Sequence, residues 1–295
     1  MRLAHISDLH VLDLAGSRLR DFLNKRMTGG LTLLLRRSKA HPVEVVAAAV
    51  EDLKEQGVDH VVVTGDLTNL SLGSEYDRAT ALLRELGGRA EVSVVPGNHD
   101  VYTRESVGRF ERACAEWLPE DLAATDWPWL KHVGDGEVAL IGVNTAVPTP
   151  WLMANGRVGG EQLKRLASLL QRDDVRDRMK VVLLHHPLLD DPEHRLYWMR
   201  KLHDAPALCE VLSAGGVDLV LHGHNHIRHR TDVQGMEVRT AASTSNVGAS
   251  GPASRAWAGY LVYEIDSASK EVQVAHRRVY DSDSGRFMAA PVPAG

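Results

Sequence analysis

The sequence has few cysteines and no long apolar run, and each shortage excludes a class of protein. Only Cys114 and Cys209 occur among 295 residues. Without CxxC spacing they indicate neither a disulfide framework nor a thiolate zinc site. No window approaches the roughly 18 consecutive apolar residues that a membrane-spanning helix requires, and no signal peptide is apparent before the polar motif at Ser7. We therefore expect a cytoplasmic protein.

The overall charge is also small. The net charge of -5 gives no global signal for a nucleic-acid partner, and we expect no specific nucleic-acid binding. The 44% apolar and 25% charged composition is that of a globular protein long enough to bury a large core. Histidine, in contrast, is plentiful, with fifteen residues. Imidazole and carboxylate are the natural metal ligands where thiols are scarce.

Apolar runs and helical periodicity alternate along most of the chain. Strands are predicted over 2–6, 60–63, 92–95, 138–143, 180–184, 217–221, 235–240, 258–265 and 271–276. Helices are predicted over 42–56, 74–86, 102–117, 160–171 and 205–214. This order indicates an α/β fold, in which ligands bind at the carboxyl ends of the strands. We expect one domain over residues 1–280 and a flexible tail over 281–295.

Two segments depart from this alternation. Residues 14–41 form an insertion rich in basic and apolar side chains in an otherwise acidic protein. It could be a solvated insertion that packs its leucines on the domain. Alternatively, residues 18–37 could bind lipid at a membrane surface, which would place the protein at the inner face of the membrane. Residues 188–204 are polar and aromatic, and we predict that they form a cap or loop over a site.

Five short polar motifs each follow an apolar run. They are Asp8-Leu9-His10, Gly65-Asp66, Gly97-Asn98-His99-Asp100, His185-His186 and Gly223-His224-Asn225-His226. Each motif alone is compatible with a turn or a surface pair. Together they place carboxylate, amide and imidazole ligands at five strand ends, which predicts a metal centre. A carboxylate that bridges two cations would allow a shared water to be activated to hydroxide and the phosphoryl oxygens to be clamped during in-line displacement.

In this order the motifs resemble the calcineurin-like metallophosphoesterase family, over roughly residues 2–226. The resemblance implies a four-layer α/β/β/α sandwich of two mixed sheets and two divalent metal ions, Mn²⁺, Fe²⁺/Fe³⁺ or Zn²⁺. It assigns one ion to Asp8, His10, Asp66 and His226, and the other to Asp66, Asn98, His185 and His224.

The resemblance also implies roles for residues beside these ligands. His99 would stabilise developing charge or protonate the leaving oxygen. Asn69 stands where several family members have an aspartate, and would orient His99 by a hydrogen bond without the support of a carboxylate. Asp100 would hold the loop, and His186 would support the ligands rather than bind metal.

The substrate is less defined than the site. The motif layout is similar to the bacterial cyclic-nucleotide phosphodiesterase-like branch, so a phosphodiester attacked by a metal-bridging hydroxide is the first choice. The long insertion, in contrast, resembles what a pyrophosphatase acting on a lipid such as UDP-2,3-diacylglucosamine would need. A non-catalytic scaffold that keeps the fold is the third alternative. The oligomeric state is not indicated by the sequence.

Overall fold

The computed structural model describes the chain except for residues 18–39, 121, 123–125, 190–196, 250 and 293–295. The predicted lipid-binding segment 18–37 lies outside the described residues, as do seven positions of the predicted cap 188–204. Both therefore stay predictions.

The first sheet is built from both ends of the chain. Its order is β12-β11-β10-β1-β2-β3. The parallel strands β1 (Arg2–Ile6), β2 (His60–Val63) and β3 (Val92–Val94) lie at one side. The antiparallel strands β10 (Gly259–Asp266), β11 (Glu271–Asp281) and β12 (Arg286–Ala290) complete it. The β-branched runs of β2 and β3 are buried on both faces, as is usual for parallel strands.

The second sheet has the order β4-β5-β6-β7-β9-β8. Its strands are β4 (Trp129–Val133), β5 (Val138–Gly142), β6 (Met179–Leu183), β7 (Leu219–His222), β8 (His229–Val233) and β9 (Met236–Thr240). Strands β5, β6, β7 and β9 run parallel, and the two edge strands are antiparallel to their neighbours. The sheet is therefore mixed, like the first.

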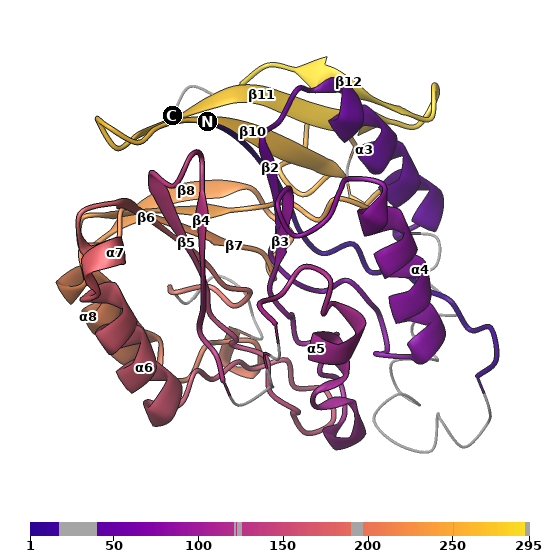
Figure 1. Cartoon of the computed structure of the whole chain (residues 1–295). Coiled ribbons are helices and arrows are strands. Elements are labelled where there is room, and N and C mark those ends of the chain that lie inside the picture. Colours follow the sequence, from indigo (N-terminus) through magenta and orange to yellow (C-terminus); the bar gives the residue numbers. More distant parts are fainter. Residues whose placement is uncertain (18–39, 121, 123–125, 190–196, 250, 293–295) are drawn as a thin grey trace.

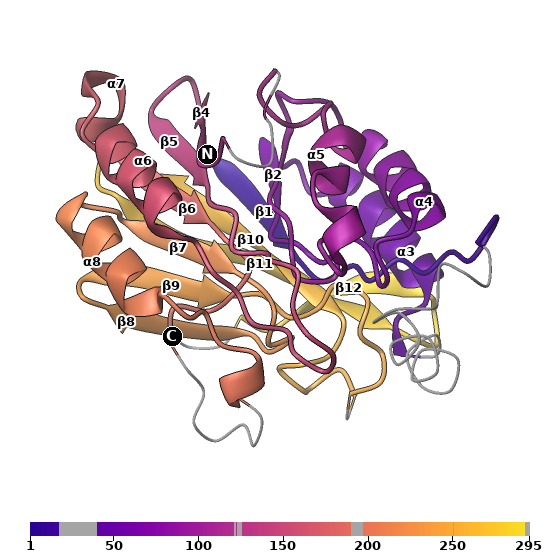
Figure 2. The same ribbon diagram turned by 90° about the horizontal axis from the view of Figure 1, so that it is seen from below.

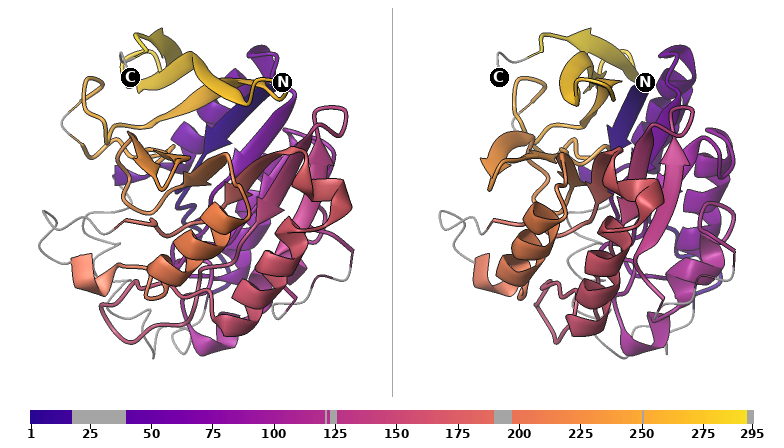
Figure 3. Two further views of the ribbon diagram at one scale, coloured as in Figure 1. Left: turned by 90° about the vertical axis from the view of Figure 1, so that its left-hand side faces the viewer. Right: turned by 60° about the vertical axis from the view of Figure 1, so that its left-hand side comes forward.

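Helices cover the outer faces of the two sheets (Figures 1 and 2). The first sheet carries α3 (Val43–Glu55), α4 (Gly73–Arg84) and α5 (Arg109–Ala113), and the second carries α6 (Gly160–Leu170), α7 (Asp173–Arg176) and α8 (Ala205–Ala214). The views in Figure 3 show the layers from the side. One apolar cluster fills the space between the sheets, and a second lies under α6 and α8. The expected four-layer α/β/β/α fold is confirmed.

Two local predictions are wrong. The helix expected over 102–117 is interrupted, because Val107 is extended and Gly108 has φ +72°. Only the 3₁₀ turn Arg104–Ser106 and the short α5 remain. The flexible tail expected over 281–295 contains β12, which pairs with β11 and buries Phe287 against Tyr260. Most residues of this segment are small or polar, so the sequence pattern did not indicate that Phe287 is buried.

In the part of the chain that the structure describes, no helix is both long enough and apolar enough to cross a membrane.

Candidate metal centre

The predicted ligands come from strand ends of both sheets. Asp8 and His10 follow β1, Asp66 follows β2 and Asn98 follows β3. His185, His224 and His226 follow β6 and β7 of the other sheet. All are buried except His226, which is half-buried. The predicted ligands therefore meet at the seam between the two sheets.

Asp8, His10, Asp66 and His226 form the first cluster. One ligand atom from each lies within 4.8 Å of the others. His226 Nε2 lies 3.1 Å from Asp8 Oδ1 and 3.0 Å from His10 Nε2. His10 Nε2 is 3.8 Å from Asp66 Oδ2. Asp8 Oδ1 is buried without a properly oriented hydrogen-bond donor among the described residues. Buried carboxylate oxygens and imidazole nitrogens directed at one point fit a cation site.

A second cluster surrounds His185. Its Nε2 lies 3.2 Å from Asn98 Oδ1, 3.2 Å from His224 Nδ1 and 3.4 Å from Asp66 Oδ2. The opposite nitrogens show where the protons are: His185 Nδ1 donates to the Thr64 carbonyl, and His224 Nε2 donates to the Arg200 carbonyl. Since a carbonyl can only accept, His185 Nε2 and His224 Nδ1 are the ring nitrogens left to face the cluster. Each of them can bind a cation through its lone pair when it carries no proton.

Asp66 belongs to both clusters through the same oxygen, Oδ2. Its other oxygen, Oδ1, accepts a hydrogen bond from the His99 amide at 2.8 Å. Gly97 makes this approach possible, since a Cβ at residue 97 would lie 2.1 Å from Asp66 Oδ1. The residues present thus fit two metal ions with Asp66 between them.

Five of the seven predicted ligands have left-handed backbone conformations. The φ angles are 53° for Asp8, 48° for His10, 54° for Asp66, 71° for His224 and 56° for His226. A non-glycine residue in this region costs about 1 kcal/mol or more, and such strain tends to occur at functional sites. The sharp turns direct these side chains away from the strand axes and into the seam.

The acids and imidazoles at the seam strongly affect one another. Burial alone would raise the pKa of Asp66, but the charges of His185 and then His99 outweigh it and hold that pKa well below its usual value. For His185 burial acts in the opposite direction, and the charge of Asp66 overcomes it to raise the pKa to about 9. A proton and a metal ion therefore compete for Nε2 of His185.

His99 lies beside the first cluster. Its ring stacks on Tyr102 with centroids 5.3 Å apart and meets His10 edge-on at 4.9 Å. Nδ1 donates to the backbone carbonyl of Asn69 at 2.6 Å. The Asn69 side chain instead donates to the His10 carbonyl. The predicted orienting hydrogen bond therefore comes from the main chain of Asn69, because the turn after Asp66 directs its amide toward the β1 loop.

Asp100 joins two loops. Its carboxylate accepts hydrogen bonds from the amides of Gly97, Leu67 and Thr68 and from the Thr68 hydroxyl. Burial, followed by the charge of Asp66, raises the pKa of Asp100 to about 7 despite these donors. The contacts are those of a loop anchor.

His186 differs from its neighbour His185. Nδ1 accepts from the Thr145 hydroxyl at 2.8 Å, and Nε2 donates to the Ala154 carbonyl at 3.1 Å. Both nitrogens are therefore used within the protein. The ring meets that of His185 edge-on, with centroids 5.1 Å apart, so it supports the position of His185.

Sequence reasoning missed two residues at this centre. His41 packs edge-on against His10 at 4.8 Å and lies 2.8 Å from the Ser245 hydroxyl through Nδ1. Arg200 donates to the His224 carbonyl at 2.6 Å, so that it holds His224 at both its ring and its backbone. Neither residue follows a strand, and only their place at the edges of the insertion and the predicted cap could have indicated them.

The fold and the two clusters define a two-sheet α/β protein with a centre suited to two metal ions. Residues 1–228 match the model of the calcineurin-like phosphoesterase family. The chain therefore belongs to this family. A comparison with curated protein sequences gives no significant match.

Solved structures share the fold. A dimetal phosphatase from Danio rerio matches with a TM-score of 0.59 and 14% identity over 94% of this chain and 96% of its own. A purple acid phosphatase from yellow lupin seeds has the same TM-score and identity, and covers 98% of this chain. This chain spans about half (52%) of the lupin protein's length. At such identities these likenesses show the fold alone.

Proposed function

We propose that this chain is a phosphodiesterase with two divalent metal ions, acting on a nucleotide-like phosphodiester. The observation that carries the proposal is the pair of clusters sharing Asp66 Oδ2. Asp8, His10, Asp66 and His226 would hold one ion, and Asp66, Asn98, His185 and His224 would hold the other. The family membership supports a phosphoester hydrolase, and the complete ligand set favours an enzyme over a scaffold.

When bound, two such ions supply Lewis-acid activation of water and of the phosphoryl oxygens. The protein supplies orientation and proton transfer. Asp66 is held by the His99 amide, and His224 is held by Arg200, so neither ligand can turn away. The hydrogen bond from His99 Nδ1 to the Asn69 carbonyl directs the opposite edge of the ring, with Nε2, away from that loop. With a proton on both nitrogens, the ring would pass the Nε2 proton to the leaving oxygen and become neutral.

Exposed aromatic side chains support a substrate with a flat ring. Trp151 is 51% exposed and Trp198 is 50% exposed. Their two loops are joined by the hydrogen bond from the Ala154 amide to the Met199 carbonyl. Ala154 and Arg200 in these loops contact His186 and His224 respectively. A nucleobase could stack on such a surface.

A hydrolysis panel tests the proposal. The metal-loaded protein would be assayed with cyclic nucleotides, bis-p-nitrophenyl phosphate, phosphomonoesters and UDP-2,3-diacylglucosamine. We expect the highest kcat/KM with a phosphodiester and a raised KM in a Trp151→Ala variant for nucleotides but not for bis-p-nitrophenyl phosphate. A preference for monoesters or for the lipid pyrophosphate would contradict the phosphodiester proposal.

Replacement of His99 tests the proton-transfer step. His99→Ala should lower kcat by about a hundredfold for diphenyl phosphate, because general acid catalysis contributes about 10²–10⁴-fold. The loss should be smaller for bis-p-nitrophenyl phosphate, whose leaving group needs little protonation. The control is His132→Ala, which removes a partly exposed imidazole that contacts Asp174. Equal losses with both esters would show that His99 does not act as the acid.

We also propose a peripheral membrane contact through residues 18–37. Six of these 20 positions are Arg or Lys and only one is acidic, a composition that favours anionic lipid surfaces. Sedimentation with anionic vesicles should retain the full chain and release a chain without residues 18–37. Retention of the shortened chain would contradict this proposal.

A further inference from the structure

A cavity of about 540 Å³ lies between the edge of the second sheet and the first sheet, and none of its lining residues is a predicted metal ligand. Strands β8 and β9 form one wall, and β10 and β11 form the other. In Figure 1 the orange β8 lies beneath the yellow β10 and β11. Four arginines line this cavity: Arg228, Arg230, Arg239 and Arg255. Among the described residues, no acidic side chain lines it.

The positive charge of this arginine cavity is only partly balanced. Glu237 pairs with Arg239 and, at 3.2 Å, with Arg230. Neither Arg228 nor Arg255 forms an ion pair with a carboxylate of the described residues. Arg228 is 7% exposed and donates from Nη2 to the Ser254 carbonyl, while its Nη1 has no hydrogen-bond partner in the described chain. A buried cation without a counter-charge is unfavourable, so an anion would stabilise this site.

The remaining wall is apolar. Leu261, Val272 and Val274 line it beside the ring of Tyr263. Arg239 lies over that ring, 4.7 Å from its centroid, so its guanidinium is held at the junction between the charged and the apolar parts. A few cationic groups beside an apolar wall are typical of a site for a small ligand.

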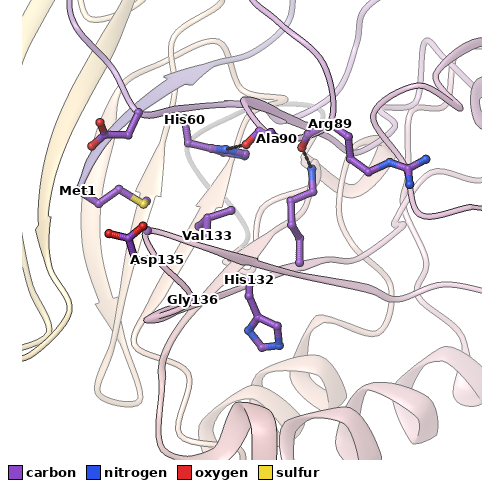
Figure 4. A pocket seen from close by; sticks show the side chains of 11 residues that line it. Met1, His60, Arg89, Ala90, His132, Val133, Asp135 and Gly136 are labelled. Atoms are coloured by element: carbon purple, nitrogen blue, oxygen red, sulfur yellow. Dashed lines mark hydrogen bonds between the residues drawn. The ribbon is translucent and has the colours of Figure 1, made fainter.

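A second pocket, of about 530 Å³, shows the contrast (Figure 4). Of its two cations, Arg89 pairs with Glu120, and Lys131 donates to the Arg89 and Val92 carbonyls and to the Ser93 hydroxyl. His60 in the same pocket contacts the Ala90 carbonyl and the Ser93 hydroxyl through its two nitrogens. These groups are already occupied by protein partners, whereas the arginine cavity retains unpaired charge.

We propose that the arginine cavity binds an amphipathic anion, with a carboxylate or phosphate head on the guanidinium groups and a hydrocarbon portion against Leu261, Val272 and Val274. A cavity of this volume accommodates a chain of about ten carbons. Guanidinium groups suit both head groups, since they form paired hydrogen bonds with planar carboxylate and with phosphate oxygens. The lining shares no residue with the predicted metal ligands, and the proposal does not depend on the hydrolytic function.

Isothermal titration of the metal-loaded full chain tests the site. Decanoate and decyl phosphate are the two probes, and decanol and inorganic phosphate each supply only one half of the ligand. We expect one molecule of at least one probe per chain and weaker binding of both half-ligands. For the probe that binds, Arg255→Gln should raise the Kd about tenfold, because a hydrogen bond to a charged group is worth about 1.5–3 kcal/mol. The control Arg176→Gln removes an exposed arginine of α7 and should leave Kd unchanged.

Three further variants keep the result unambiguous. Val274→Trp should block the apolar wall and abolish binding, and Arg230→Gln provides a second charge test if the tryptophan variant does not fold. Asp66→Asn, which alters the metal centre, should leave Kd unchanged. The proposal is overturned if neither probe binds, or if binding is lost with Asp66→Asn and kept with Arg255→Gln, since the anion would then bind the metal centre.

Discussion

Asp66→Asn is expected to lower hydrolysis of bis-p-nitrophenyl phosphate by at least about a hundredfold, because metal ions contribute several kcal/mol to transition-state stabilisation. Asp66 Oδ2 lies 3.8 Å from His10 Nε2 and 3.4 Å from His185 Nε2, so this one oxygen faces both clusters. Asparagine keeps the size of the side chain, and one of its polar atoms can still face the His99 amide. The variant therefore removes the negative charge between the clusters while the loop stays in place. Metal analysis should show fewer than two ions per chain.

The matched control is Asp77→Asn, which neutralises an exposed carboxylate on α4. Its activity and metal content should equal those of the unmodified protein. If Asp66→Asn kept both properties as well, a dinuclear centre bridged by Asp66 would be ruled out.

Gly97→Ala should destabilise the fold and impair the site together. The added Cβ would lie 2.1 Å from Asp66 Oδ1 and 2.4 Å from the Asp66 backbone nitrogen. The Asp66 backbone cannot rotate away as the tip of a side chain can. The loop after β2 and the loop after β3 must therefore move apart. We expect a loss of about 1–3 kcal/mol in the free energy of unfolding, measured in urea. Activity should fall about a hundredfold, since a displacement near 1 Å has effects of this size.

Gly73→Ala separates this effect from the general effect of a methyl group. Gly73 begins α4, and a Cβ there meets nothing within 4 Å. This control should leave activity unchanged and keep or slightly raise stability, as alanine reduces the entropy of the unfolded chain. A Gly97→Ala protein as stable and active as Gly73→Ala would show that the β2 and β3 loops are not closely packed.

The parts of the fold that could be predicted are those with strong local patterns. Buried parallel strands appear in the sequence as short β-branched runs such as 60–63, and each run marks where its polar residues will lie. Strand β12 has only Phe287 as a fully buried apolar residue, so its place depends on pairing with β11. The two strands form a hairpin, but a strand with one buried apolar residue lacks the alternating pattern that would identify it in the sequence.

The same distinction applies to the site. Ligand types at strand ends can be recognised because their chemistry is in the side chain. The hydrogen bond to His99 comes from the backbone carbonyl of Asn69, a group that every residue has, so the sequence could not reveal it. His41 lies 31 residues beyond His10 in the chain, and only the folded structure brings the two rings to 4.8 Å.

The position of the ligands at the seam links metal binding to folding. Asp8, Asp66 and Asn98 belong to one sheet, and His185, His224 and His226 belong to the other. An ion held between them would act as a cross-link, and its binding free energy would add to the cohesion of the sandwich. By mass action, free metal at a thousand times its Kd would stabilise the folded state by about 4 kcal/mol. Metal supply would thus govern the lifetime of the protein against proteolysis as well as its activity.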